Sequence, residues 1–217
     1  MKISFTANGT TTELKAVGDG RWDSSPNNPA FILRSSPLNL QPDRIAVAAT
    51  LLFGDNFGGI VDFGRPVNLV TAGGIQDYCS PVKVYPKQID EGPKPIPAGS
   101  RNLNIFRGEW GGGLPAIENS LNESYLFLMD SSHFDGVISF QRGLAVSSNL
   151  WLHGQSVERS IAWHLAAGVL YAGMFDANLI TVPQQVALDA SSDYLRRAQN
   201  LLGTVGLGLQ LKYTGAK

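Results

Sequence analysis

The seven residues from Asp130 to Gly136 bring together two carboxylates, two hydroxyls and one of the three histidines of the chain. Asp130, His133 and Asp135 are the candidate catalytic residues, because carboxylates and an imidazole can share a proton or ligate a metal. A metal site is not predicted, since it needs more ligands than this segment supplies. The alternative is that Asp130 or Ser131 caps a following helix, that His133 packs at its start and that Asp135 is solvated.

The segment follows Tyr125–Met129, a continuous apolar run that is typical of a strand buried on both faces of a parallel sheet. Ligands of open α/β sheets bind beyond the carboxyl ends of the strands, where residues 130–136 would lie. The order of the later elements predicts a βαβ layer. These elements are a helix from Ser156 to about Ala172, a strand at Leu179–Val182, a helix from Ser191 or Ser192 to Gly203, and a strand in which Val205, Leu207, Leu209, Leu211 and Tyr213 alternate with other residues.

The first half of the chain has the character of strands and loops. Asn8-Gly9 separates two alternating segments, Ile3–Ala7 and Glu13–Val17, which predicts a hairpin. Asp43–Phe53 is apolar nearly all round and predicts a buried helix with Gly54 as its C-cap. Short strands are expected at Ile60–Phe63, Val67–Thr71, Val82–Tyr85 and Leu103–Phe106.

The predicted fold class is therefore α/β, with a β-rich N-terminal half followed by a mostly parallel sheet with helices; a single α+β domain is the alternative. The triple glycine Gly111–Gly113 is the best candidate for a boundary. It would separate a β-rich region, residues 1–113, from an α/β region, residues 114–217. One continuous domain is the alternative, since 217 residues suit either arrangement.

A strand followed by Ser131-x-x-x-Asp135 is similar to the Ser-Gly-Gly-x-Asp-Ser pyrophosphate loop of one family, and Arg159-Ser160 then opens a helix rich in small residues. In this order of features, residues 124–217 resemble the QueC-like (7-cyano-7-deazaguanine synthase) branch of the PP-loop ATP-pyrophosphatases. The resemblance implies that Ser131, Ser132, Asp135 and Arg159 would bind the cofactor, which would be ATP if the loop is functional. It also implies a context of bacterial defence, in which QueC-like proteins occur.

The loop departs from the family's pattern. Ser132 and His133 replace its two glycines, and their Cβ atoms crowd the backbone amides that must wrap round a phosphate. Gly136 replaces the final serine, and the family's cysteine zinc site is missing, since Cys79 is the only cysteine. These departures favour a degenerate pseudo-enzyme, for which no bound cofactor is expected.

The charge of the chain bears on its partners. Charged residues make up 16% of the chain and the net charge is −1, so self-repulsion is small and a lasting protein partner or a homo-oligomer is expected. A dedicated nucleic-acid binder would need clustered basic residues. Arg101, Arg107 and Trp110 could nevertheless form an edge that stacks on bases and contacts phosphates. Trp22, Trp110 and Trp151 fall in predicted loops, where exposure would favour an interface and burial beneath the loops is the alternative.

The single cysteine excludes an internal disulfide, and Cys79 is expected to be a small buried residue rather than a nucleophile. Met1–Thr6 turns polar at once and lacks the apolar core of a signal peptide. Ile161–Phe175 is too short to span a bilayer, so it predicts a buried helix in which His164 is a core histidine with satisfied hydrogen bonds. No membrane partner and a cytoplasmic location are expected.

Three functions remain open. No Gly-x-Ser-x-Gly, His-Glu-x-x-His or Walker sequence is present, so the favoured function is a non-catalytic interaction or assembly subunit of a protein complex. The second is a nucleotide- or metal-dependent enzyme that uses residues 130–136. The third is a nucleic-acid-binding module.

Overall fold

The structure is a computed structural model, and it describes residues 1–38, 40–96, 99–108, 120–152, 157–187 and 190–212. Within these residues the chain forms four α-helices and 13 strands, which confirms the predicted mixed α/β class. The helices are α1 (Pro42–Phe53), α2 (Leu69–Tyr78), α3 (Val157–Tyr171) and α4 (Ser192–Gly203). The strands are β1 (Lys2–Ala7), β2 (Thr12–Val17), β3 (Ala30–Leu33), β4 (Gly59–Val61), β5 (Val67–Asn68), β6 (Val84–Pro86), β7 (Ile89–Asp90), β8 (Arg101–Gly108), β9 (Glu123–Asp130), β10 (Val137–Phe140), β11 (Gly143–Ser148), β12 (Ala177–Pro183) and β13 (Gly208–Lys212).

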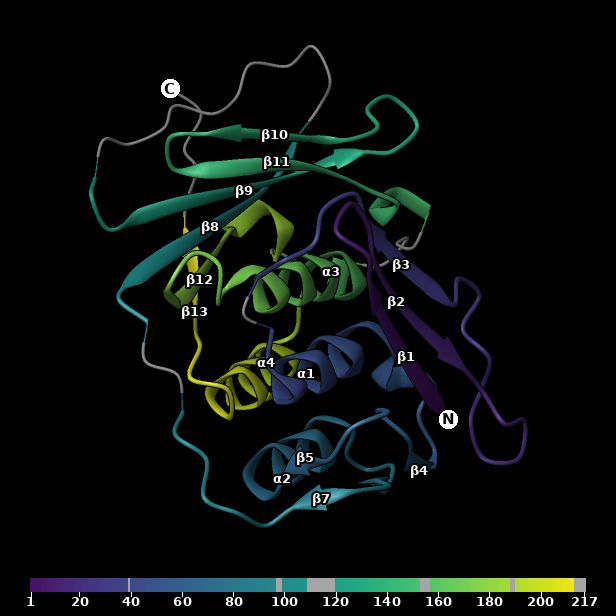
Figure 1. Ribbon diagram of the computed structural model, residues 1–217. Helices are drawn as coiled ribbons and strands as arrows, with labels where there is room; N and C mark the ends of the chain where they lie inside the picture. Colours follow the sequence, from purple (N-terminus) through teal and green to yellow (C-terminus); the bar gives the residue numbers. More distant parts are fainter. Residues whose placement is uncertain (39, 97–98, 109–119, 153–156, 188–189, 213–217) are drawn as a thin grey trace.

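Nine of the described strands form one mixed sheet in the order β1-β2-β3-β11-β9-β8-β12-β13, with β10 paired to β11 (Figure 1). The run from β11 to β13 is parallel throughout, as predicted for the second half of the chain. Strands β1 to β3 are antiparallel and join β11 through Leu33 and Ser148. Strands from both predicted regions therefore share one sheet. The predicted boundary at Gly111–Gly113 lies outside the described residues.

The chain crosses the parallel strands in two directions. It runs from β8 to β9 and through β10 to β11, and α3 then carries it back across the sheet to β12, from which α4 leads to β13. The order of the strands thus reverses between β8 and β12, which are neighbours. A reversal of this kind is a topological switch point, where the carboxyl ends of the strands leave room for a ligand.

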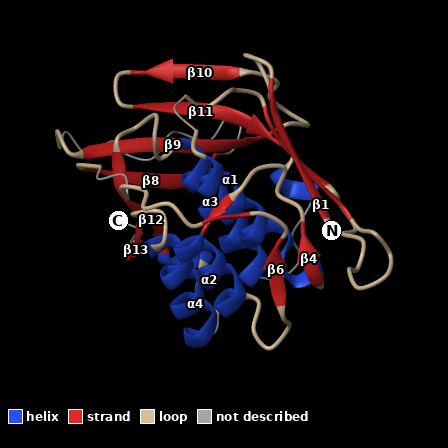
Figure 2. Cartoon of the chain, turned by 60° about the horizontal axis from the view of Figure 1, so that its bottom comes forward, coloured by secondary structure: helices blue, strands red, loops and turns tan. Residues whose placement is uncertain are grey.

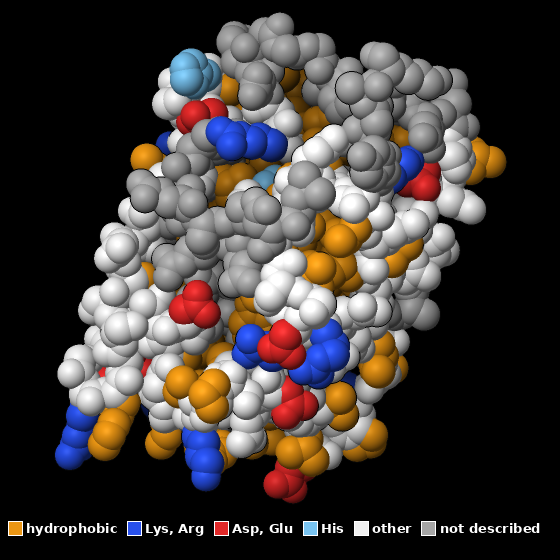
Figure 3. Space-filling view, turned by 180° about the vertical axis from the view of Figure 1, so that it is seen from behind, with side chains coloured by type: hydrophobic (Ala, Val, Ile, Leu, Met, Phe, Trp, Pro, Cys, Tyr) orange, Lys and Arg blue, Asp and Glu red, His pale blue; other side chains and the backbone are white. Residues whose placement is uncertain are grey.

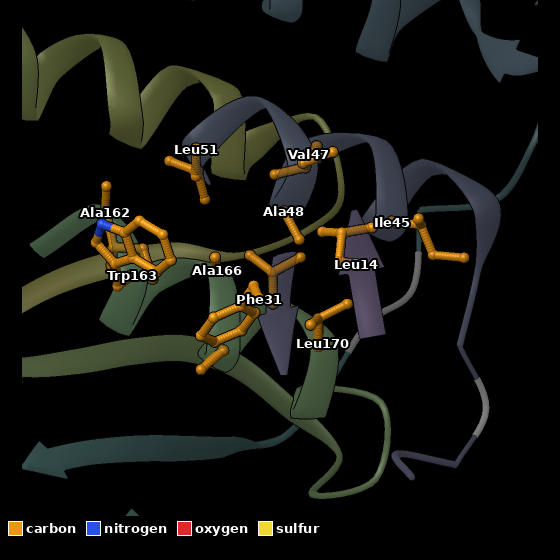
Figure 4. Close-up of a cluster of buried hydrophobic side chains, with 14 of the residues drawn as sticks. Leu14, Phe31, Ile45, Val47, Ala48, Leu51, Ala162, Trp163, Ala166 and Leu170 are labelled. Carbon is orange, nitrogen blue, oxygen red and sulfur yellow. The ribbon is translucent and has the colours of Figure 1, made fainter. Parts of the chain in front are cut away.

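The helices gather on one side of the sheet, with α3 nearest to it (Figures 1 and 2). Small residues let α1 and α3 approach closely: Ala48 of α1 and Ala162 and Ala166 of α3 lie in the same buried cluster (Figure 4). Phe31 of β3 meets Trp163 of α3 edge-on, with 5.5 Å between the ring centroids. The buried helix predicted around Ile161–Phe175 is thus confirmed over its first part. No helix among the described residues is both long and apolar enough to cross a membrane.

Strand β9 confirms the interpretation of the run Tyr125–Met129. All residues from Ser124 to Met129 are buried, and the strand is parallel to β8 on one side and to β11 on the other. Tyr125 and Phe127 stack with Phe106 of β8 in one hydrophobic cluster, while Leu126 and Leu128 belong to the cluster that includes the helices. The strand is therefore buried on both faces.

Other local predictions are also confirmed. The hairpin forms between β1 and β2, with Gly9 at a φ of +87° in the turn. Ser191 caps α4 by accepting a hydrogen bond from the Tyr194 amide at 3.1 Å. The predicted cap of α3, Ser156, lies outside the described residues.

One prediction in the first half is wrong. The expected strand Val67–Thr71 ends at Asn68, whose side chain accepts a hydrogen bond from the Val70 amide at 2.9 Å and so starts α2. The predicted buried helix with Gly54 as its C-cap is confirmed by α1; Gly54 has a φ of −56° rather than a left-handed one, and the chain continues into a short 3-10 helix.

Candidate functional site

The backbone amides of the segment after β9 are already occupied. Ser131 N donates to Ser148 O at 2.9 Å, and Ser132 N donates to Asp130 Oδ1 at 2.8 Å. His133 N and Phe134 N both donate to Asp130 O, at 3.1 and 2.9 Å. A phosphate cradle needs amides that point to the ligand. In this conformation none of these four amides points outward to one.

The candidate side chains of this segment do not converge. His133 Nδ1 lies 3.7 Å from Asp130 Oδ2 and 2.8 Å from the Ser132 hydroxyl. Asp135, which is 70% exposed, instead pairs with Arg34 Nε at 2.8 Å. The described part of the chain holds no group of three His, Cys, Asp or Glu residues that could bind a metal. The structure thus brings together Asp130, Ser132 and His133 but not Asp135. The Arg159 side chain lies outside what is described.

The charge state of Asp130 follows from these contacts. The hydrogen bond from the Ser132 amide is the largest cause of the lowered pKa of Asp130, and the positive charge of Arg107 acts in the same direction. Asp130 is therefore ionised at neutral pH and acts as a hydrogen-bond acceptor.

The alternative in which Asp130 or Ser131 caps a helix is wrong. The segment is a turn, and after Gly136, at a φ of +148°, the chain enters β10. Strand β10 forms an antiparallel hairpin with β11, from Val137↔Val146 to Phe140↔Gly143. Asp130 therefore stabilises a strand-to-strand turn.

The carboxyl edge of the parallel strands carries further polar groups. Asp130 of β9 lies opposite Ser148 of β11, and Gly108 of β8 lies opposite Met129 of β9, so Arg107 is close to the same edge. Arg101 is at the other end of β8, about 20 Å away along the strand. The two arginines proposed for a nucleic-acid edge are therefore separated, and Trp110 lies outside the described residues.

His164 of α3 is predicted from the sequence to lie in the core. Its side chain is 1% exposed and its Nδ1 lies 2.6 Å from Ser160 O, so Nδ1 carries the proton and donates it. Nε2 is buried and has no hydrogen-bond partner among the residues that the structure describes. The expected satisfied histidine is therefore satisfied at one nitrogen only. Burial is the main cause of its lowered pKa, and the nearby charge of Arg107 adds to it. Figure 3 shows acidic, basic and histidine side chains close together at one end of the molecule.

Cys79 and a cavity near α1 and α2 are weaker candidates for a functional site. Cys79 is half-buried rather than fully buried, and burial raises its pKa to about 12, so it remains a thiol at neutral pH. A cavity of about 470 Å³ lies between the first turns of α1 and α2 and residues 91–96. Its lysine, Lys94, lies 2.9 Å from Asp90 and 3.9 Å from Asp43, so its charge is already balanced.

A third surface lies where β4 and β6 meet β1. Ile60 of β4 pairs with Tyr85 of β6, and Lys2 of β1 forms a parallel bridge with Asp62. The apolar side chains there are exposed: Val17 52%, Trp22 74%, Ile60 64% and Tyr85 46%. We name this surface the corner face and define it by Lys2, Val17, Trp22, Ile60, Asp62, Tyr85 and Lys87.

The corner face is held rigidly. Asp62 accepts a hydrogen bond from Lys87 at 2.8 Å, which is the largest cause of the lowered pKa of Asp62. Asp23, next to Trp22, accepts a hydrogen bond from the Gly58 amide at 2.9 Å. A Cβ at Gly58 would lie 2.0 Å from the Trp22 carbonyl oxygen, so only glycine permits this approach. The backbone that carries Trp22 is thereby fixed against β4. The 74% exposure of Trp22 agrees with the expectation that a loop tryptophan is exposed rather than buried beneath its loop.

Comparisons with protein-family models, with curated proteins and with solved structures found no match for this chain. They bear neither for nor against the QueC-like resemblance. Proposals about function therefore rest on the geometry described above.

Proposed function

We propose that this protein is a non-catalytic interaction or assembly subunit of a protein complex, and that the corner face binds its protein partner. The observation that carries the proposal is the exposure of large apolar side chains on neighbouring strands and the adjoining loop, with Trp22 and Ile60 exposed most. Contiguous exposed apolar surface of this kind marks interaction sites.

The composition of the corner face suits a protein partner. Trp and Tyr are enriched among the residues that dominate binding energy, and Ile60 adds apolar area between Trp22 and Tyr85. Lys2 and Lys87 flank these residues, while the carboxylate of Asp62 is matched by Lys87. An acidic rim on the partner would therefore complement this face. The low charged fraction of the chain, 16%, also favours a lasting association.

The pseudo-enzyme form of the proposal is supported by the segment after β9. Ser132 and His133 stand where the resembled family has glycines, and their amides are donated within the segment. A phosphate would have to break these hydrogen bonds before it could bind there. On this view the QueC-like scaffold, if the chain shares it, would serve assembly rather than nucleotide chemistry.

The test places a photo-reactive benzoylphenylalanine at Tyr85 and, as a control outside the corner face, at Leu121, an apolar side chain that is 79% exposed. We expect light to give one defined crosslinked product, identified by mass spectrometry, at position 85 only. That product should disappear when Trp22→Ser and Ile60→Ser are added. The proposal is contradicted if position 85 gives no crosslink and the protein is strictly monomeric. It is also contradicted if positions 85 and 121 crosslink equally.

The enzyme alternative makes a different prediction. If residues 130–136 bind a nucleotide or metal, ATP or Mg²⁺ should raise the melting temperature of the wild type and Asp135→Ala should remove that rise. We expect neither ligand to act through Asp135, because Asp135 pairs with Arg34. A rise that depends on Asp135 would favour the enzyme.

A further inference from the structure

The cavity between α1 and α2 is built by hydrogen bonds of its own walls. Strand β5 pairs with β7, so Asn68 lies opposite Asp90 and residues 91–96 lie beside the start of α2. The Asn68 side chain donates to Gly92 O at 3.2 Å, and the Gly92 amide donates to Asp90 Oδ1 at 2.9 Å. These hydrogen bonds hold the loop against α2, and the first turn of α1 closes the cavity on another side.

Most of the large side chains that line the cavity are apolar. Leu69 and Val70, in the first turn of α2, are 57% and 60% exposed, and Ile96 of the loop is 56% exposed. The volume of about 470 Å³ falls within the range of small-molecule sites, about 300 to 1,000 Å³. A ligand with an apolar body would cover these three side chains and remove their apolar surface from water.

Asp43 of α1 supplies a polar group with unused bonding capacity. It lines the cavity and is 8% exposed. Its Oδ1 atom accepts a hydrogen bond from the Asn68 amide at 2.7 Å, but its Oδ2 atom lies 3.9 Å from Lys94 Nζ, which is beyond hydrogen-bond distance. Lys94 is instead held by Asp90 at 2.9 Å. The Oδ2 atom can therefore accept a hydrogen bond from a ligand.

The charges around the cavity favour a cation. Lys94 and Asp90 compensate each other, which leaves the carboxylates of Asp43 and Glu91 in the lining. The N-termini of α1 and α2 offset about one of these two charges, because each contributes about +0.5. A negatively charged ligand would therefore be repelled, whereas an ammonium would be attracted and would also donate the hydrogen bond that Asp43 Oδ2 can accept.

We propose that this cavity binds a small primary amine with an apolar body. The ammonium donates to Asp43 Oδ2, and the hydrocarbon part packs on Leu69, Val70 and Ile96. Apolar lining with one well-placed charged group is the usual composition of a small-molecule site. No residue of the corner face lines the cavity, so the proposal goes beyond the proposed function and is independent of it.

The test uses amines and uncharged or oppositely charged molecules of similar shape. We propose to titrate the full chain with 2-phenylethylamine and hexylamine, and with 2-phenylethanol, 1-hexanol and hexanoate as controls. The readout is the NMR shift of the backbone amides of Asn68, Leu69 and Ile96. We expect saturable shifts with an amine, and alcohol binding weaker by about tenfold or more, because the charge-assisted hydrogen bond is lost. The tighter of the two amines identifies an aromatic or an aliphatic body.

The proposal is overturned if neither amine shifts these signals at about 10 mM. It is also overturned if an alcohol or hexanoate binds as tightly as the amine of the same body.

Three variants complete the test. Asp43→Asn keeps an oxygen for the Asn68 amide but removes the charge, so amine binding should weaken about tenfold or more. Lys94→Met removes the competing ammonium and should tighten amine binding about threefold. Lys15→Met, at an exposed position of β2, is the matched control and should bind like the wild type. Unchanged binding by a folded Asp43→Asn, or equal binding by the two lysine variants, contradicts the proposal.

Discussion

The corner face and the packing of α3 against the sheet leave opposite kinds of group unsatisfied. On the corner face Asp62 is paired with Lys87, while Ile60 and Trp22 are exposed to water. In the core the apolar Val182 is buried, and His164 Nε2 is buried with no hydrogen-bond partner among the described residues. Exposed apolar area is covered when a macromolecule binds, whereas a buried acceptor without a partner only lowers stability. The corner face is therefore the better candidate for binding a partner.

The segment after β9 differs from both regions. It holds many polar side chains, yet the amides of Ser131 through Phe134 and the carboxylates of Asp130 and Asp135 have partners within the chain. Its polar groups stabilise the turn into β10. A concentration of polar residues in the sequence is therefore weaker evidence for a site than unsatisfied bonding capacity in the fold.

The largest expected effect concerns the corner face. Ile60→Ser combined with Tyr85→Ser should weaken partner binding about 100-fold or more, because central interface side chains each contribute about 2 kcal/mol. The free energy of unfolding should change by less than about 1 kcal/mol, since both side chains are largely exposed. Surface plasmon resonance with the identified partner measures the first effect and urea unfolding the second. Unchanged affinity would remove the corner face from the interface.

The packing of α3 against the sheet can be broken at Gly168. Gly168→Val should lower the free energy of unfolding by about 1 to 3 kcal/mol, because the added atoms overlap Ile105 and Ile180. Gly73→Ala in α2 is the matched control: nothing lies within 4 Å of its Cβ position, so it should stabilise the protein by about 0.5 to 1 kcal/mol. Equal urea midpoints for the two variants would contradict the placement of α3.

The pH dependence of stability sharpens the contrast between buried and exposed histidines. The pKa of His164 is lowered from 6.5 in the folded protein, so below about pH 6.5 the unfolded chain binds a proton that the folded chain does not. The free energy of unfolding should therefore fall between about pH 6.5 and 5.5. The carboxylates with lowered pKa values, such as Asp62, act in the same direction but only near and below pH 3.8.

The measurement is thermal unfolding of the wild type, His164→Gln and His133→Gln across this pH range. We expect His164→Gln to flatten the dependence. The exposed control, His133→Gln, should retain it. A wild-type stability that does not change between these pH values would be inconsistent with a neutral, buried His164.

The smallest expected effect is at the exposed ion pair of the turn. Asp135→Asn should change the free energy of unfolding by less than about 1 kcal/mol, because its partner Arg34 is also exposed. Urea unfolding at low and high salt measures it. A much larger loss would mean that the turn after β9 contributes more to stability than its exposure indicates.

Local patterns predicted much of the fold. The continuous apolar run Tyr125–Met129 and the alternation around Asn8-Gly9 are both local signals, and both elements form as expected. The start of α2 was missed because the apolar residues after Val67 suit a strand equally well; the signal was Asn68, a good N-cap. The hairpin of β10 and β11 was missed because a segment after a buried strand more often leads to a helix in an α/β protein.

The sites were less predictable than the fold. The location beyond β9 follows from topology, but the sequence does not reveal that its amides are used internally. Arg107 and His164 are far apart in the sequence, yet the charge of Arg107 lowers the pKa of His164, whose helix α3 packs closely on Ile105 at Gly168. Trp22 lies in a loop, and whether such a side chain is exposed depends on contacts such as the one between Asp23 and Gly58. Distant packing thus decides the surroundings of His164 and Trp22.

Hydrogen–deuterium exchange tests the central claim most directly. It would compare the protein isolated with its partner at native abundance with the same protein alone. The account predicts that the partner slows exchange at β4 and β6, around Ile60 and Tyr85, and leaves residues 131–136 unchanged. Slower exchange confined to residues 131–136, with β4 and β6 unaffected, would contradict it.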